Sequence, residues 1–245
     1  MKKFKFSIIT VCLNSEKFLE RCINSVKNQN YTNYEHIIID GGSNDNTLKI
    51  IEKNKSYFSK IVSNKDNGIW DAMNKGLELS SGDLICFLNS DDFYYPHALE
   101  LINSYFNKYN VDFLFGSVKK YKIMYGYQPW KINFSFGFYS SHSVGFFIKR
   151  AKHLQVGYYD TKFLSADLNF FYKMISQNNL VGISTKKYEV IGEFEPGGFS
   201  SKINYIEHLK DLNKIRIHNG QSKILVYFLY IIKILKKPLK FIKSI

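Results

Sequence analysis

The feature that most constrains the fold is a regular alternation of strand and helix patterns over the first hundred residues. Short apolar, β-branched runs occur at 6–13 (FSIITVCL), 34–40 (YEHIIID), 59–63 (SKIVS) and 83–88 (DLICFL). Each is followed by a segment whose apolar residues recur every three or four positions, which is typical of a helix with one buried face. Strands that alternate with helices predict an α/β fold with a doubly wound, mostly parallel sheet.

The ends of the predicted elements carry recognisable signals. Asn14 or Ser15 is expected to cap the first helix, and Pro96 suits the first turn of the helix after the fourth strand. Past residue 110 the alternation weakens, and the predicted elements are strand-like pieces at 111–118 and 144–150, helices at 166–178 and 202–217, and a glycine-rich loop at 195–201.

Polar residues gather where the predicted strands end. The clusters are 10–14, 40–43, 66–68 and 89–92. Ligands of such sheets bind outside the carboxyl ends of the strands, so these clusters are expected to share one rim and to form a site.

The last cluster, Asn89-Ser90-Asp91-Asp92, places two carboxylates side by side at the mouth of an apolar strand. Like charges repel, and neither can be buried without compensation. Two interpretations stay open: a solvated turn that caps the next helix, and a site for a divalent cation.

Composition indicates a folded protein with an anionic partner in a reducing compartment. The chain has 245 residues and is 45% hydrophobic, which excludes a disordered chain, and its net charge of +13 favours an anionic partner. Cys12, Cys22 and Cys86 lie in apolar segments and are interpreted as reduced core residues. The apolar stretch at 4–13 is interpreted as a strand and not as a secretory signal.

Neither familiar phosphate loop is present. GGSNDNT lacks the spacing of a P-loop, and no G-x-G-x-x-G follows the first strand. This argues against a P-loop ATPase and a dinucleotide dehydrogenase. If phosphates bind at the rim, Mg²⁺ or Mn²⁺ is the natural bridge between them and the carboxylates.

Three segments in this order, 6–47 (FSIITVCLNSEKFLERCINSVKNQNYTNYEHIIIDGGSNDNT), 66–76 (DNGIWDAMNKG) and 82–92 (GDLICFLNSDD), carry a family resemblance. The chain resembles the nucleotide-sugar-dependent family 2 glycosyltransferases, which have the Rossmann-like GT-A fold. It is most similar to the bacterial branch that builds capsular, O-antigen and exopolysaccharide repeats. The resemblance is strong over 5–110 and thinner through His142, Asp167 and EPGGFSS.

The resemblance implies a role for individual residues. The positions that match donor-binding residues are Thr10, Asn14, Asp40, Asp66, Gly68, Asn74, Asn89 and Ser90. Asp91 matches the metal ligand, with Asp92 supporting it, and Asp167 matches the general base of inverting members. His142 matches a position near the acceptor, and Gly197, Gly198 and Ser200 match a loop that closes over the diphosphate.

The chain also departs from the family pattern. Gly41 stands where many members have a second Asp, Asn89 replaces the first Asp of the D-x-D motif, and Met73 replaces an Arg. Asp167 follows Ala166 where many members have another acid, so helix capping stays open as its role.

Structural roles stay open for other residues too. Asp40 could start a turn, and Asp71 and Asn74 could lie on an exposed helix face. Trp70 is interpreted as packing more than as sugar stacking, and His142 could be a structural histidine.

The implied activity is an inverting transfer from a nucleoside-diphosphate sugar, favouring a UDP sugar, to a glycan acceptor that a lipid carries. One alternative is a nucleotidyltransferase, which would be expected to have a Gly-rich, basic loop after its first strand, unlike CLNSEKFL. Another is a non-catalytic nucleic-acid-binding protein, but much of the excess charge lies late in the chain beside apolar runs. No nucleic-acid partner is expected.

Three regions are predicted: a nucleotide-sugar-binding half at 1–110, an acceptor and catalytic-base half at 111–220, and a basic amphipathic tail at 221–245. The tail has six lysines and no acid, and its longest uncharged apolar run, Ile224 to Ile232, is nine residues, against roughly 20 needed to span a bilayer. It is predicted to lie on anionic lipid, with a helix packed on the domain as the alternative. The expected location is cytoplasmic, peripheral at the inner face of the membrane.

Overall fold

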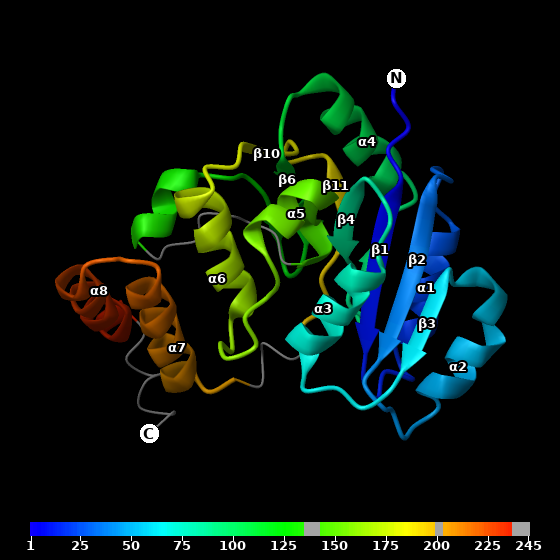
Figure 1. The fold of residues 1–245 in the computed structure, drawn as a ribbon, viewed down its shortest axis with the longest axis horizontal. Coiled ribbons are helices and arrows are strands. Elements are labelled where there is room, and N and C mark those ends of the chain that lie inside the picture. The colour runs from blue at the N-terminus through cyan, green and yellow to red at the C-terminus, as the bar shows by residue number, and fades with distance from the viewer. Residues whose placement is uncertain (135–142, 199–202, 237–245) are drawn as a thin grey trace.

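The computed structural model describes residues 1–134, 143–198 and 203–236 (Figure 1). Its strands are β1 (Phe6–Cys12), β2 (Tyr34–Asp40), β3 (Lys60–Ser63), β4 (Leu84–Phe87), β5 (Phe93–Tyr94), β6 (Phe113–Phe115), β7 (Ser117–Lys119), β8 (Ile123–Met124), β9 (Phe146–Lys149), β10 (Gly182–Ser184) and β11 (Val190–Glu193). Its α-helices are α1 (Leu19–Lys27), α2 (Thr47–Lys53), α3 (Ile69–Leu79), α4 (Ala98–Lys108), α5 (Arg150–Val156), α6 (Ala166–Tyr172), α7 (Tyr205–His218) and α8 (Lys223–Lys236). Tighter or wider turns are η1 (Lys55–Tyr57), η2 (Pro129–Phe134), η3 (Ser143–Gly145) and η4 (Lys173–Gln177).

Seven strands form the main sheet, in the order β10-β6-β9-β4-β1-β2-β3. All neighbouring pairs are parallel except those of β9, which runs antiparallel to both β4 and β6. The prediction of a mostly parallel sheet is therefore confirmed. A second, smaller sheet has the order β5-β11-β7-β8 and was not predicted, because its strands are only two to four residues long.

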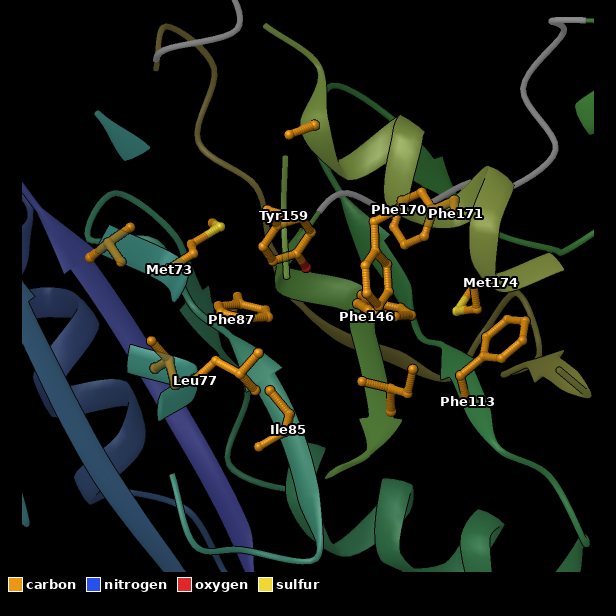
Figure 2. Close-up of a cluster of buried hydrophobic side chains, with 14 of the residues drawn as sticks. Met73, Leu77, Ile85, Phe87, Phe113, Phe146, Tyr159, Phe170, Phe171 and Met174 are labelled. Carbon is orange, nitrogen blue, oxygen red and sulfur yellow. The ribbon is translucent and has the colours of Figure 1, made fainter. Parts of the chain in front are cut away.

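The central strands β1, β2 and β4 of the main sheet are buried on both faces, as their apolar residues predict. In β1, Phe6 and Ile8 pack toward α1 and α4, whereas Ile9 and Val11 pack toward α3. Figure 2 shows the second of these cores, in which Phe87 and the side chains of α3 and α6 converge over the sheet. The three cysteines are buried and free, as predicted.

Two predicted helix starts are wrong. The first helix begins at Leu19, because the Ser15 carbonyl accepts from the backbone N–H groups of Phe18 and Leu19 and forms a separate turn before it. The Ser15 hydroxyl bonds instead to Ser90 Oγ at 2.8 Å, so this segment joins two loops of the rim. Pro96 lies before α4, which begins at Ala98.

The predicted strand at 111–118 is split into β6 and β7 at Gly116. A Cβ at this position would come within 2.3 Å of Ile191 Cδ1, so glycine lets Ile191 of β11 pack closely on the chain between β6 and β7. The strand at 144–150 is confirmed as β9, and the helix at 166–178 as α6 followed by η4.

The C-terminal helices lie at the opposite end of the molecule from α2 and β3 (Figure 1). The tail begins as predicted with a helix, α8, which packs on α7; its remainder, 237–245, lies outside the described residues. In the described part of the chain, no helix combines the length and the apolarity that crossing a bilayer requires.

Candidate active site

A cavity of about 1210 Å³ opens at the carboxyl edge of the parallel strands. The loops after β1, β3 and β4 form one side, and α6, α7 and the loop at 195–198 form the other. The predicted site residues that line it are Asn14, Asp66, Gly68, Asn89, Ser90, Asp91, Asp167, Gly197 and Gly198. Residues from five separate parts of the chain therefore meet at one site. His142 and Ser200 lie outside the described residues.

Thr10 and Asp40 do not line the cavity. Both side chains are fully buried, and Thr10 Oγ1 lies 2.9 Å from Nε2 of His36. The Asp40 carboxylate accepts hydrogen bonds from the hydroxyl groups of Ser43 and Ser63 and from the Ser43 backbone N–H, so it holds the loop after β2 in place. Their predicted contacts with the donor stay predictions.

Asn74 and Trp70 join α3 to the segment that precedes α6. The Asn74 side chain donates to the Tyr159 carbonyl and accepts from the Tyr159 N–H, both at 2.9 Å. Trp70 lines the cavity and donates from Nε1 to the Leu164 carbonyl at 3.0 Å. Asp71 accepts a hydrogen bond from the backbone N–H of Asn67 in the turn before α3. It also forms an ion pair with Lys75, one turn further along the helix. The contacts of Asn74 and Trp70 fix α3, which lines the cavity, against the segment before α6.

The loop after β4 holds the predicted metal ligands. Asp91 lines the cavity, whereas Asp92 is fully buried and accepts from the Glu195 N–H at 2.9 Å through Oδ1. Two buried oxygens of this loop, Asn89 Oδ1 and Asp92 Oδ2, have no hydrogen-bond partner among the described residues. A buried oxygen without a hydrogen-bond partner destabilises the folded protein unless a bound ligand interacts with it.

The pKa values of Asp91 and Asp92 also indicate that this loop would be stabilised by a bound cation. Burial raises the pKa of Asp91, and the nearby Arg21 guanidinium only partly offsets this effect. The pKa of Asp92 is raised well above its usual range, first by burial and then by the charge of Asp91. Positive charge placed at this loop would therefore favour the ionised form of both carboxyl groups.

The oxygen atoms of this loop fit a divalent cation that a substrate helps to hold. No group of three His, Cys, Asp or Glu side chains in the described ranges forms a metal site by itself. Mg²⁺ and Mn²⁺ do not need one, because they bind through one or two carboxylates and complete their shell with water and phosphate oxygens. Asp91 would supply the carboxylate at the cavity, with Asn89 and Asp92 behind it.

Arg21 ties this loop to the glycine-rich loop across the cavity. Its Nη2 donates to the Asp91 carbonyl at 2.6 Å and to the Glu195 carboxylate at 2.8 Å, and its guanidinium covers the ring of Phe93. The backbone of Gly198 also lies close to Asp91, since an added Cβ would come within 2.6 Å of Asp91 Oδ2. Sequence analysis missed Arg21, whose only signal is its place on the polar face of α1.

Replacing Arg21 with Ala is expected to raise the KM for the donor about tenfold with little change in stability. The guanidinium makes charge-assisted bonds that position two loops, and losing one such bond costs about 1.5–3 kcal/mol, whereas an exposed ion pair adds little to the folded state. Steady-state kinetics at varied donor and Mn²⁺ concentrations would measure the change. Lys53→Ala is the matched control, because it removes another exposed ion pair of α1, to Glu20, away from the cavity. Equal KM values for both variants would contradict the role.

The other side of the cavity carries Asp167, in the first turn of α6. Ser165 occupies the N-cap position, so Asp167 is not the cap. Asp211 of α7 accepts from the backbone N–H groups of Leu164 and Ser165 and thereby holds the start of α6. Burial raises the pKa of Asp167 to about 6, and the charge of Asp211 contributes in the same direction.

Helix α7 supplies cavity residues that sequence analysis did not identify. Tyr205, His208 and Leu212 face the cavity beside Asp167. The His208 Nδ1 lies 3.4 Å from Ser165 Oγ. These positions carry no motif, and only the packing of α7 on α6 brings them to the site.

If Asp167 accepts a proton during the reaction, kcat/KM is expected to rise with pH through about 6, because the carboxyl group must be ionised to act as a base. Asp211→Asn should move the midpoint to lower pH, because removing a like charge lowers the pKa of Asp167. A pH profile at saturating Mn²⁺ would measure both. A profile without an inflection near pH 6 in the wild-type protein would contradict the assignment.

Comparison with known proteins agrees with this geometry. The chain is 34% identical to UDP-Glc:alpha-D-GlcNAc-diphosphoundecaprenol beta-1,3-glucosyltransferase WfgD of Escherichia coli over 118 residues, which is 48% of this chain and 47% of that protein. The chain thus matches about half the length of this curated relative, and a smaller part of the next ones.

Solved structures share the fold at low sequence identity. S. aureus TarS in complex with UDP-GlcNAc superimposes with a TM-score of 0.70 at 18% identity, over 92% of this chain and 70% of that one. The mannosyltransferase PcManGT from Pyrobaculum calidifontis, in complex with GDP-Man and Mn²⁺, gives a TM-score of 0.69 at 15% identity, over 92% and 69%.

The family described as Glycosyl transferase family 2 matches residues 7–178, well over half of the chain. This range includes the loops after β1, β3 and β4 and, on the other side of the cavity, α6 with Asp167. The chain therefore belongs to glycosyl transferase family 2 and has the GT-A fold.

Proposed function

We propose that the protein is an inverting glycosyltransferase that moves a sugar from a nucleoside-diphosphate sugar, favouring a UDP sugar, to a hydroxyl group of a lipid-linked glycan in cell-surface polysaccharide synthesis. Family membership supports the reaction class, and the WfgD relative supports the acceptor class by its name. The observation that carries the proposal is that Asp91 and Asp167 line the same cavity from opposite sides.

The chain's own residues account for the steps of such a transfer. The acceptor oxygen forms a bond to the anomeric carbon and gives its proton to the Asp167 carboxylate, whose raised pKa suits a base that works near neutral pH. The bond from that carbon to the diphosphate oxygen breaks, and the electron pair leaves with the nucleoside diphosphate. Attack from the face opposite the leaving group inverts the carbon.

Residues on the donor side would position and neutralise the leaving group. Asn14, Asp66 and Gly68 line the part of the cavity next to the loop of Asp91. Mn²⁺ or Mg²⁺ bound at Asp91 would supply positive charge to the diphosphate. Gly197 and Gly198 line the same region, and a side chain at Gly198 would crowd the Asp91 carboxylate.

We place the enzyme in the cytoplasm, peripherally at the inner face of the cell membrane. A nucleotide sugar is water-soluble, whereas a lipid-linked glycan is confined to the membrane, so an enzyme that joins them works at that surface. The free, buried cysteines suit a reducing compartment.

The test is a panel of nucleotide sugars, incubated with the protein and membrane lipid extract, with Mn²⁺ or with EDTA. We expect release of nucleoside diphosphate from one donor, with Mn²⁺ only, and a product whose anomeric configuration by NMR is opposite to that of the donor. Release of pyrophosphate from a nucleoside triphosphate and a sugar phosphate would instead indicate a nucleotidyltransferase. Retention of configuration would overturn the inverting mechanism.

A further inference from the structure

Helix α8 has one face packed against the rest of the protein. Val226 and Leu229 are buried, and the Tyr205 hydroxyl of α7 donates to the Lys233 carbonyl at 3.2 Å. The helix is therefore fixed in orientation, and its outward face is a defined surface. Removing the helix would uncover α7, so its function is better tested by substitutions on the outward face.

The outward face of α8 is apolar and uncovered. Its large exposed side chains are Ile224, Tyr227, Phe228, Ile231 and Leu235. Ile224, Phe228, Ile231 and Leu235 recur every three or four residues and form one stripe along the helix, with Tyr227 beside it. Ile224 is 84% exposed and Leu235 is 72% exposed, which is unusual for adjoining apolar residues on a water-facing surface.

Aromatic residues of η2 extend this stripe. Trp130, which is 62% exposed, and Phe134 share a shallow hollow with Lys131 and with Lys236 at the end of α8. Trp beside Lys is the combination found where proteins meet the headgroup region of a bilayer, because the ring is amphipathic and the lysine reaches the phosphates.

The charge that α8 itself contributes to this surface has one sign. The helix carries Lys223, Lys233 and Lys236 and contains no acidic residue. A stripe of apolar residues flanked by lysines complements an anionic lipid surface.

We propose that the outward face of α8, together with Trp130 and Phe134, docks the protein on an anionic bilayer surface; this deepens the proposed function, on which it rests for its purpose. The helix lies in the plane of the headgroups, with its apolar stripe toward the acyl chains and its lysines at the phosphates. Tyr205 lines the cavity and also bonds α8, so the docked face is one helix away from the acceptor side of the active site.

The experiment is co-sedimentation of the full-length protein with vesicles of phosphatidylcholine alone or with about one third phosphatidylglycerol, at low and high salt. We expect binding to the anionic vesicles at low salt and at least about tenfold weaker binding to the neutral ones. The triple variant Ile224→Ser, Phe228→Ser, Ile231→Ser should lose binding at least about tenfold, as should Lys233→Glu with Lys236→Glu. The matched controls Tyr121→Ser with Tyr188→Ser, and Lys3→Glu with Lys49→Glu, change exposed residues elsewhere and should bind as the wild type does.

Three outcomes would overturn the proposal. The wild-type protein could fail to bind anionic vesicles at low salt, or the triple variant could bind them as well as its control does. The third outcome is a wild-type protein that binds no vesicles but forms a dimer in solution, which the triple substitution dissociates. The last would mean that the stripe joins two copies of the chain. Nucleotide release from soluble donor, measured on every variant, reports on the proposed function separately. Vesicle binding without any such release would leave the docking surface standing and remove the enzyme activity.

Discussion

The Asp91→Asn variant is expected to lose sugar transfer by at least about 10³-fold in kcat/KM while its fold stays intact. A neutral amide binds divalent cations poorly, and the diphosphate would then leave without charge compensation. Stability should not fall. Because folding raises the pKa of Asp91, its ionised form disfavours the folded state above the ordinary pKa of Asp, and Asn removes that cost at pH 7. Nucleotide release and the thermal midpoint would be measured together.

A second readout separates metal binding from catalysis. Wild-type protein with UDP and Mn²⁺ should unfold at a higher temperature than with UDP alone, by mass action, and Asp91→Asn should lose this increment. Asp83→Asn is the control. Asp83 lies just before the first residue of β4, at the end away from the cavity, and accepts a hydrogen bond from the Lys5 backbone N–H. Full activity of the wild type in EDTA would disprove the metal role.

Asp167→Asn should lower kcat by about 10²–10⁴-fold while donor affinity stays near that of the wild type. The amide keeps the size of the side chain and can still accept from the Leu168 N–H, but it cannot take a proton from the acceptor. Titration calorimetry with UDP and Mn²⁺ would give donor-side affinity, and single-turnover kinetics would give the chemical step.

The control is Asn169→Ala on the same helix. Asn169 is buried, its side chain accepts a hydrogen bond from Asn219, and it does not line the cavity. It should affect stability more than turnover. If Asp167→Asn instead lost UDP binding and kept its single-turnover rate, Asp167 would be a binding residue and the base would lie elsewhere.

The fold of the first hundred residues was predictable because its signals are local. Each of β1 to β4 lies in a short segment rich in apolar and β-branched residues. The apolar stripe of the following helix is visible in the sequence, as for Ile69, Met73 and Leu77 of α3. The small sheet was not predictable. Its strands depend on partners as distant as Val118 and Gly192, and each is too short to show a period.

The same contrast holds for the site. Asp91 could be found because two acids after an apolar strand are conspicuous in one sequence. Arg21 and Asp211 could not, since each acts on a loop far along the chain, at Glu195 and at Ser165, and nothing local marks that encounter. Asp40 and Asn74 show the reverse: conspicuous polar residues whose bonds in the structure go to neighbouring protein atoms.

The antiparallel strand β9 has a consequence for how such enzymes can be rebuilt. It pairs with β4 on the side away from β1, and it comes from residues 146–149, long after β1 to β4 have been synthesised. A fragment ending near residue 110 would leave the edge of β4 open, ready to pair with another chain. A hybrid of two relatives joined between residues 110 and 146 would therefore pair β4 of one parent with β9 of the other. A hybrid enzyme has to inherit β4 and β9 from the same parent, or have the pairing between them redesigned.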